Sequence, residues 1–469
     1  MALLIKGGEI VTAEMHARGD ILIEGETIRA IGQGLDPPPG AEVIDATGKL
    51  VFPGFIDPHV HIHLPFMATF AKDTHATASK AALIGGTTAF IEMVCPARND
   101  DALEAYQLWK EKAEGNSSCD YAFHMAVTRY NGKETEAQLR AIVADGTASF
   151  KVFLSYKNFF GVNDEELFQT LKLAAKLGVI TTAHCENAEL VAQLQQQLLS
   201  EGKTGPEWHE PSRPETVEAE GTSRFATFVE ETGATGYVVH LSCAPALRAA
   251  VEAKLRGVKL HVETVLPHLL LDKSYGERPG VEGMKYIMSP PLRHERNLPV
   301  LWSALQAGMI DTVATDHCPF DQEQKLLGAK AFTQIPNGIA GIEDRVNLMY
   351  TYGVKRGRLD LHRFVDALST RPARLFGLFP KKGAIAVGSD ADLVVYDTTW
   401  RGKISAGTQQ VNNDYNAFEG FDVEGRPALV TVRGAVQVRD GVFVGEPGRG
   451  RMLRRAPHDV AQTVVPGAG

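Results

Sequence analysis

Residues 50–61 read LVFPGFIDPHVH, an apolar run that ends in an aspartate and two histidines. Its near-continuous hydrophobicity predicts a strand that is buried on both faces. In an extended segment, residues i and i+2 point to the same side, so His59 and His61 can hold one metal ion together. The alternative is a pair of core or surface histidines, because the motif is short.

Seven more apolar stretches resemble this one, and longer amphipathic stretches such as residues 101–115 and 164–178 lie between them. The eight predicted strands are residues 50–57, 87–94, 119–127, 148–156, 179–186, 236–243, 258–265 and 310–318. Eight β/α repeats over about 320 residues predict an α/β fold, a (β/α)8 TIM barrel with long insertions.

Both ends of the chain are rich in short β-like segments broken by glycine, unlike the middle. The simple solution is one small β-sandwich built from both termini. We therefore expect β-sandwich segments at residues 1–52 and 381–444, a barrel over residues 53–380, and a C-terminal tail over residues 445–469.

Composition excludes several classes of function. The formal net charge is -9, so nothing draws the molecule to nucleic acid or to an anionic membrane. The start, MALLIKGGEI, is too short an apolar run for a signal peptide, and no segment approaches the roughly 20 apolar residues of a membrane span. Five widely spaced cysteines fit a reducing cytoplasm better than a disulfide framework.

Four more unusual residues lie at the ends of predicted strands, where the active site of such a barrel is found. Lys151 lies inside an apolar strand, where a desolvated ammonium needs a partner or loses its proton. A neutral lysine amine can react with CO₂ to form a carbamate, an anionic bridging ligand; the alternative is a lysine that reaches solvent. His184, His240 and Asp316 end three other strands, and each alone could be a core histidine or a helix cap.

Together these residues point to a metal site. A two-metal centre explains all six at once, with divalent ions about 3.5–4 Å apart. Zinc is the first expectation for histidine-rich ligation, with manganese, cobalt or nickel as substitutes.

Nine motifs, in order, resemble the D-hydantoinase and dihydropyrimidinase family of the amidohydrolase superfamily. They are DPHVHIHLPF, SFKVFLSYKNFFGVNDEELF, AHCEN, VVHLSCA, MSPPLR, ATDHCPF, IPNGIAGIEDR, LFGLFPKKGAIAVGSDADLVVYD and NNDYNAFEG, and the resemblance runs from about Ile5 to Val444. It implies hydrolysis of a cyclic amide to an N-carbamoyl amino acid.

The resemblance also implies a role for each site residue. His59 and His61 would bind the more buried metal with Asp316, which would also shuttle the proton to the leaving ring nitrogen. The remaining roles are the second metal for His184 and His240, a carboxylated bridge for Lys151, oxyanion stabilisation for Tyr156, and backbone groups that hold the cyclic amide at Ser289 and Asn337.

Apolar residues close to these motifs are candidates for binding the ring substituent: Leu64, Phe66, Phe153, Phe159 and Phe160. Phe153 lies two residues from Lys151 and so on the same strand face. The alternative is a set of core aromatics. Cys185, Cys243 and Cys318 follow metal-site residues closely, and we interpret them as small core residues because the donor set is complete without them.

Two departures from the family pattern, His63 and the pair Glu92-Met93, are expected near the entrance, where they would affect substrate preference. Competing functions are allantoinase, dihydroorotase or imidase activity, or a non-catalytic scaffold. The segment after His61 holds no arginine for an acidic substrate, and a scaffold would have no reason to keep six metal positions. The resemblance further suggests self-association as a dimer or tetramer, with the basic tail crossing to a neighbouring subunit as far as about Asp459.

Overall fold

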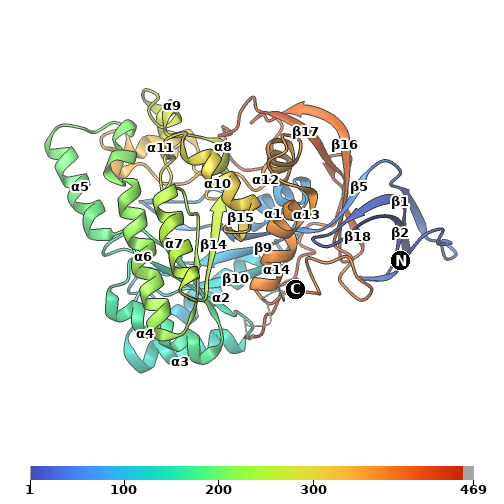
Figure 1. Cartoon of the computed structure of the whole chain (residues 1–469), viewed down its shortest axis with the longest axis horizontal. Coiled ribbons are helices and arrows are strands. Elements are labelled where there is room, and N and C mark those ends of the chain that lie inside the picture. Colours follow the sequence, from blue (N-terminus) through green and yellow to red (C-terminus); the bar gives the residue numbers. More distant parts are fainter. Residues whose placement is uncertain (1, 458–469) are drawn as a thin grey trace.

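The computed structural model describes residues 2–457, and eight of the described strands form the expected parallel barrel (Figure 1). They are β6 (Phe55–Val60), β9 (Thr87–Val94), β10 (Asp120–Ala126), β11 (Ser149–Phe153), β12 (Ile180–His184), β13 (Thr235–Val238), β14 (Leu260–Val265) and β15 (Thr312–Ala314). They pair in this order, and the ring closes between β6 and the chain after β15, where the His61 amide donates to the His317 carbonyl at 2.8 Å.

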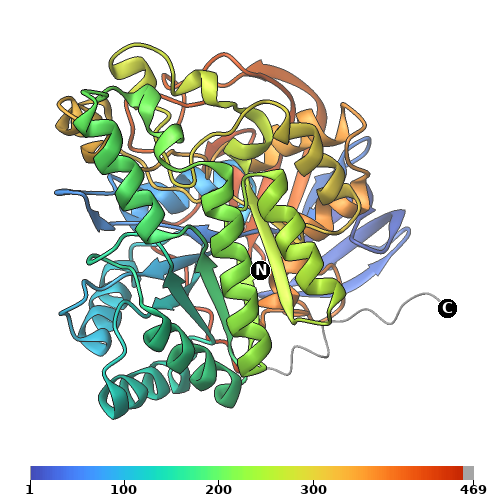
Figure 2. The ribbon, with the colours of Figure 1, turned by 60° about the vertical axis from the view of Figure 1, so that its left-hand side comes forward.

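Helices follow the strands and cover the barrel, as Figure 2 shows for α6 and α7. The α-helices are α1 (His75–Ile84), α2 (Ala102–Ala113), α3 (Gly132–Ala144), α4 (Asp164–Leu177), α5 (Ala188–Ser200), α6 (Glu215–Thr232), α7 (Ala244–Leu255), α8 (Leu266–Leu270), α9 (Val281–Met284), α10 (Asn297–Gln306), α11 (Gln322–Lys325), α12 (Arg345–Leu348), α13 (Leu361–Val365) and α14 (Arg371–Leu375). Over the described residues, none of the helices has the length and apolarity that crossing a lipid bilayer requires.

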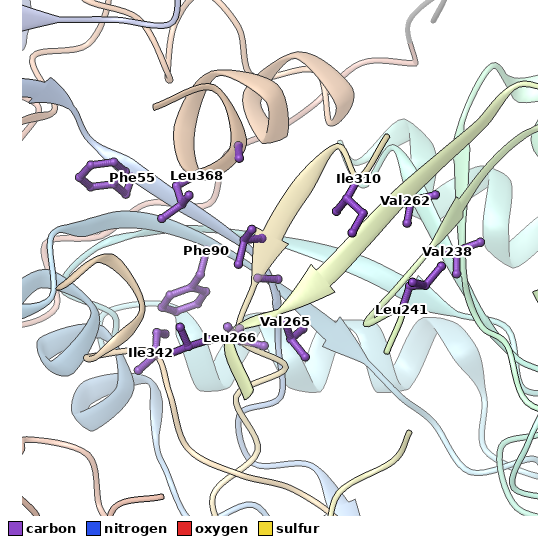
Figure 3. Close-up of a cluster of buried hydrophobic side chains, with 14 of the residues drawn as sticks. Phe55, Phe90, Val238, Leu241, Val262, Val265, Leu266, Ile310, Ile342 and Leu368 are labelled. Carbon is purple, nitrogen blue, oxygen red and sulfur yellow. The ribbon is translucent and has the colours of Figure 1, made fainter. Parts of the chain in front are cut away.

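Successive side chains of each barrel strand point to opposite faces, so neighbouring residues enter different parts of the core. Phe55 and Phe90 belong to the large cluster that packs the barrel against its helices, which Figure 3 shows in part. The next residues along, Ile56 and Ile91, belong instead to a second cluster, which also holds Phe376 from the end of α14. The strands are therefore buried on both faces, as their hydrophobicity predicts.

The two ends of the chain combine as predicted into one β-domain. Its strands are β1 (Ala2–Val11), β2 (His16–Glu24), β3 (Thr27–Gly32), β4 (Glu42–Asp45), β5 (Leu50–Pro53), β16 (Leu393–Lys403), β17 (Asp422–Val432), β18 (Ala435–Arg439) and β19 (Val442–Phe443). Hydrogen bonds link these nine into one continuous sheet, in which antiparallel pairing of β16 with β5 joins the two ends of the chain. A small separate hairpin, β7 (Pro65–Phe66) with β8 (Thr69–Phe70), follows β6.

The first predicted strand, residues 50–57, is in fact two strands that serve different sheets. Its first half is β5 of the terminal sheet and its second half begins β6 of the barrel. The break falls at Gly54, where a Cβ atom would lie 2.1 Å from the Thr88 hydroxyl oxygen. Only glycine allows the chain to pass that close at the point where the backbone leaves one sheet and enters the other.

The described part of the tail packs against its own barrel. The Leu453 amide donates to the Tyr121 carbonyl at 2.6 Å, and the Arg455 amide donates to the Gly146 carbonyl at 2.8 Å. The Arg455 side chain is 2% exposed and donates to the Ser149 hydroxyl at 2.9 Å. The subunit contact expected for the tail stays a prediction, and residues 458–469 lie outside the described residues.

Candidate metal centre and substrate cavity

One cavity lies at the carboxyl ends of the barrel strands, and every residue predicted for metal, catalysis or substrate except Phe159 lines it. These residues are His59, His61, Leu64, Phe66, Lys151, Phe153, Tyr156, Phe160, His184, His240, Ser289, Asp316 and Asn337. Cys318 and Gly338 also line the cavity. Parallel strands with their carboxyl ends at one face bring together residues that lie far apart in the sequence.

Three of these side chains form a compact donor cluster. His59 Nε2 and His61 Nε2 each lie 3.1 Å from Asp316 Oδ1. Burial raises the pKa of Asp316, but the neighbouring imidazoles of His59 and His61 outweigh it and hold that pKa well below its usual range. The carboxylate is therefore ionised, and the cluster can hold a cation.

A buried acid orients His59. Its Nδ1 lies 2.7 Å from Glu263 Oε1, and the Tyr237 hydroxyl donates to the other oxygen of Glu263 at 2.7 Å. This contact leaves Nε2 of His59 for the cluster. Acidic partners of this kind fix the tautomer and the ring orientation of metal-binding histidines.

The remaining donors stand next to this cluster. The rings of His184 and His240 are 4.6 Å apart between centroids, and those of His59 and His240 are 5.5 Å apart. His184 Nε2 lies 2.6 Å from Glu186 Oε2, which leaves its Nδ1 for a metal. The two sets of donors predicted from the sequence therefore lie next to each other in the folded chain.

Lys151 lines the same cavity as these two groups of donors and is in an unusual state. Its side chain is fully buried, and Nζ has no hydrogen-bond partner among the described residues. Burial lowers the pKa of Lys151 to about 8, against the opposing pull of the Asp316 and Glu263 carboxylates. An unpaired buried ammonium is costly, so the site fits an amine that loses its proton and gains a stabilising partner.

Tyr156 projects into the cavity from a strained turn just after β11. Its φ is 55°, and the φ values of His240 and Asp316, 40° and 52°, are also left-handed. Such conformations cost roughly 1–3 kcal/mol each and are kept where the surrounding structure fixes them, often at functional sites. Burial raises the pKa of Tyr156 to about 12, so its hydroxyl stays protonated and can donate a hydrogen bond.

Two loops opposite Tyr156 carry Ser289 and Asn337. The Asn337 amide nitrogen donates to the Ser289 hydroxyl at 3.0 Å, and the Gly338 amide donates to the Ile287 carbonyl at 2.9 Å. On the far side, His209 Nε2 lies 2.8 Å from the Met288 carbonyl oxygen. The two loops are thus joined into one wall.

The apolar candidates form the side of the cavity near the β7–β8 hairpin. Phe160 stacks on Phe153 at 5.2 Å and on Phe66 at 5.9 Å between ring centroids. Leu64 belongs to the same cluster. Phe159 does not line the cavity with them; it is 40% exposed and lies at the rim.

The expectation for Glu92 and Met93 is wrong, because both are buried behind the cavity and not near its entrance. Glu92 is completely buried; it accepts from the Trp109 indole at 3.0 Å and the Ile62 amide at 3.2 Å, and lies 2.6 Å from His75 Nε2. A buried carboxylate requires such partners, so Glu92 supports the chain that follows His61.

The sequence did not point to several charged residues around the site. Glu263 is a charged residue inside an apolar strand, as Lys151 is. The reasoning that singled out Lys151 could therefore also have identified Glu263. Arg213 comes from a long insertion without a pattern; its guanidinium lies 5.5 Å from the centroid of the Tyr156 ring and 2.5 Å from Glu186 Oε2. An arginine thus lies near the site, but its charge is paired.

Comparisons with known proteins extend over nearly the whole chain. Residues 50–436 match the amidohydrolase family. The chain is 45% identical to the D-hydantoinase of Geobacillus stearothermophilus, over 98% of this chain and 97% of that protein. It is 38% identical to the dihydropyrimidinase of Rattus norvegicus, over 97% of this chain and 89% of that protein. The structure matches a solved D-hydantoinase (dihydropyrimidinase) from Thermus sp. with a TM-score of 0.96 and 74% identity, over 97% of this chain and 100% of that one.

Proposed function

Because this chain belongs to the amidohydrolase family, and its full-length relatives include D-hydantoinases and dihydropyrimidinases, we propose that it hydrolyses the cyclic amide bond of hydantoins, of dihydropyrimidines or of both. The product of each ring opening is an N-carbamoyl amino acid. The observation that carries this proposal is the single cavity in which six donor side chains face Tyr156, Ser289 and Asn337.

We propose that the site holds two divalent cations, of which zinc suits the donors best and manganese, cobalt or nickel could substitute. His59, His61 and Asp316 would hold one cation, and His184 and His240 the other. A carboxylated Lys151 would bridge them, which the buried and unpaired Nζ supports. When bound, such cations make water a stronger nucleophile near neutral pH and polarise the amide carbonyl.

The protein's own groups would then guide the reaction. The Tyr156 hydroxyl donates a hydrogen bond to the carbonyl oxygen as that oxygen gains negative charge. Asp316 accepts a proton from the attacking water and passes it to the ring nitrogen as the C–N bond breaks. Backbone groups at Ser289 and Asn337 hold the ring in place while Phe66, Phe153 and Phe160 contact its substituent.

Two of the competing functions, dihydroorotase activity and a scaffold role, fit the site less well. An acidic substrate such as dihydroorotate needs an unpaired arginine, and Arg213 is bound to Glu186. A scaffold would need none of the strained backbone that presents Tyr156, His240 and Asp316. We further propose a cytoplasmic location, in keeping with five buried free cysteines, and self-association into dimers or tetramers.

The test compares the wild type with Lys151→Ala and, as a control, with Lys157→Ala, whose exposed ammonium pairs with Glu189 at 2.7 Å. We expect about two metal ions per chain and ring opening in the wild type and the control, and loss of both in Lys151→Ala. Metal analysis and consumption of dihydrouracil and 5-monosubstituted hydantoins measure these outcomes. A wild type that holds two metals but opens neither ring would disprove the substrate assignment.

A further inference from the structure

We propose that Lys325 is a positioning residue that fixes the two substrate-holding loops and thereby sets substrate affinity, an inference that rests on the proposed function. Lys325 ends the short helix α11 and is completely buried. Its ammonium donates to three backbone carbonyls, those of Ile287 at 2.9 Å, Pro336 at 2.7 Å and Gly338 at 2.8 Å.

These three carbonyls belong to the chain segments that present the candidate substrate contacts. Ile287 lies two residues before Ser289, and Pro336 and Gly338 lie on either side of Asn337. The ammonium therefore holds both loops from behind, while the Asn337–Ser289 hydrogen bond joins them in front at 3.0 Å. A shift of the ammonium would move the backbone on which the ring is expected to rest.

The chemistry of the contact explains why a cation stands here. Among residues 2–457, no carboxylate forms a salt bridge with Lys325, and burial lowers its pKa to about 7. The three carbonyl oxygens and the face of the Phe320 ring, 5.7 Å from Nζ, favour the protonated form, which alone has three hydrogens to donate. Burial without an acidic partner is the unfavourable state of a lysine, and charge-assisted bonds to several acceptors are what make it tolerable. The three carbonyls must therefore stay converged for the helix to pack, which restricts both loops together.

Helix α11 also holds a third wall of the cavity. The side-chain amide of Gln324 donates to the Thr69 hydroxyl at 2.8 Å and to the Phe70 carbonyl at 2.9 Å. Thr69 and Phe70 form β8, which pairs with Phe66 in the cavity wall. One short helix thus joins the hairpin and the two loops, which makes Lys325 the natural place to disturb the substrate grip without touching the metal donors.

The experiment compares Lys325→Met with the wild type and with Lys285→Met, whose ammonium pairs with the partly exposed Glu282 at 2.6 Å. We expect Lys325→Met to keep its metal content and to raise KM by about tenfold or more. The value of kcat should change less than about threefold, because the substitution weakens the binding of the ring and leaves the metal donors in place. Lys285→Met should leave both constants near the wild-type values.

Hydrogen exchange provides a readout that does not depend on activity. In Lys325→Met, peptides that cover residues 285–293 and 334–341 should exchange faster by about tenfold or more, while those over residues 55–61 and 149–154 should not change. Should Lys325→Met fail to fold, Lys325→Arg is measured in its place. Arginine keeps a cation for the carbonyls, so its KM should rise by less than the roughly tenfold expected for Lys325→Met.

Two results would overturn the inference: an unchanged KM with unchanged exchange in the two loops, or faster exchange spread evenly over the barrel, which marks a merely structural lysine. A wild type that opens none of the rings tested refutes the proposed function instead. In that case the exchange pattern still decides whether Lys325 fixes these loops.

Discussion

Tyr156 is the residue whose environment most clearly separates binding from chemistry. Its ring stands beside that of His184, with 5.3 Å between the ring centroids, and its hydroxyl is protonated. Removing that hydroxyl in Tyr156→Phe should lower kcat by about 10²–10³-fold, the usual cost of losing one oxyanion donor. The metal content should not change, because the tyrosine is not among the donors. Steady-state kinetics and metal analysis measure both quantities.

The control is Tyr275→Phe, which removes a hydroxyl from a ring that is tilted against Tyr286, with 4.9 Å between the ring centroids, away from the cavity lining. It should leave kcat unchanged. Equal losses in the two variants would contradict an oxyanion role for Tyr156, and a loss of metal in Tyr156→Phe would show that the variant disturbs the donors.

At this scale, residue type at the ends of apolar strands predicted the six donor positions, whereas Tyr156, Ser289 and Asn337 were predicted from the family resemblance. The six donor positions, Tyr156 and the two loop residues all line the cavity. The residues that support them were harder to predict, because Arg213 and Lys325 act through partners that are distant in sequence. A lysine bonded to three carbonyls has no local signature, since any backbone can supply such acceptors.

Closure of the barrel between β6 and β15 depends on side chains more than on a strand ladder. The Thr315 hydroxyl donates to Asp57 Oδ2 at 2.6 Å, and the His317 amide donates to the Thr315 hydroxyl at 3.1 Å. Asp57 is completely buried and precedes His59, while Thr315 precedes Asp316. This closure therefore sets the distance between the two halves of the donor cluster.

The substitution Thr315→Val removes the hydroxyl and leaves Asp57 and the His317 amide short of a partner. We expect a loss of about 1–3 kcal/mol in the free energy of unfolding. Metal affinity should fall by about 10–100-fold, as it does when the support of a ligand is removed. Thr264→Val, which loses a 2.8 Å bond to the Leu241 carbonyl, is the matched control.

Urea unfolding measures the stability change, and competition with a chelator measures the metal affinity. Both threonine variants should lose stability, but only Thr315→Val should lose metal affinity. Equal metal affinity in the two variants would mean that closure at this point does not position the donors.

The elements themselves were largely predictable, because hydrophobic runs of strand length alternate with amphipathic helices. Each of the eight predicted barrel strands overlaps an observed one, and the terminal strands share one sheet. The division of residues 50–57 between two sheets was not predictable, since the apolar run continues from Leu50 to Ile56 across the boundary. The boundary falls at Gly54, whose close approach to Thr88 only the folded chain shows.

Over the whole molecule, buried charges join the terminal sheet to the barrel. The Lys382 ammonium lies 2.6 Å from a carboxylate oxygen of Asp120, at the start of β10, and 2.7 Å from one of Asp392, just before β16. Arg433, between β17 and β18, also pairs with Asp120. Separating the sheet from the barrel would leave these buried charges without their partners. The two domains should therefore unfold together.

The tail extends this connection beneath the barrel, which leads to a prediction about truncation. Ending the chain after Gly448 removes Arg455 and leaves its acceptors, the Ser149 hydroxyl and the Phe123 carbonyl, without that donor. Each buried group left unsatisfied costs about 1–3 kcal/mol, so this truncation should lower the melting temperature by several degrees. Ending the chain after Pro457 removes only residues 458–469 and should not lower the melting temperature.

Calorimetry on both truncated chains measures the difference, and light scattering on the same samples measures association. If both truncations melt like the full chain, Arg455 does not stabilise the barrel; if only the shorter chain dissociates from oligomer to monomer, the tail also contributes the subunit contact predicted for it.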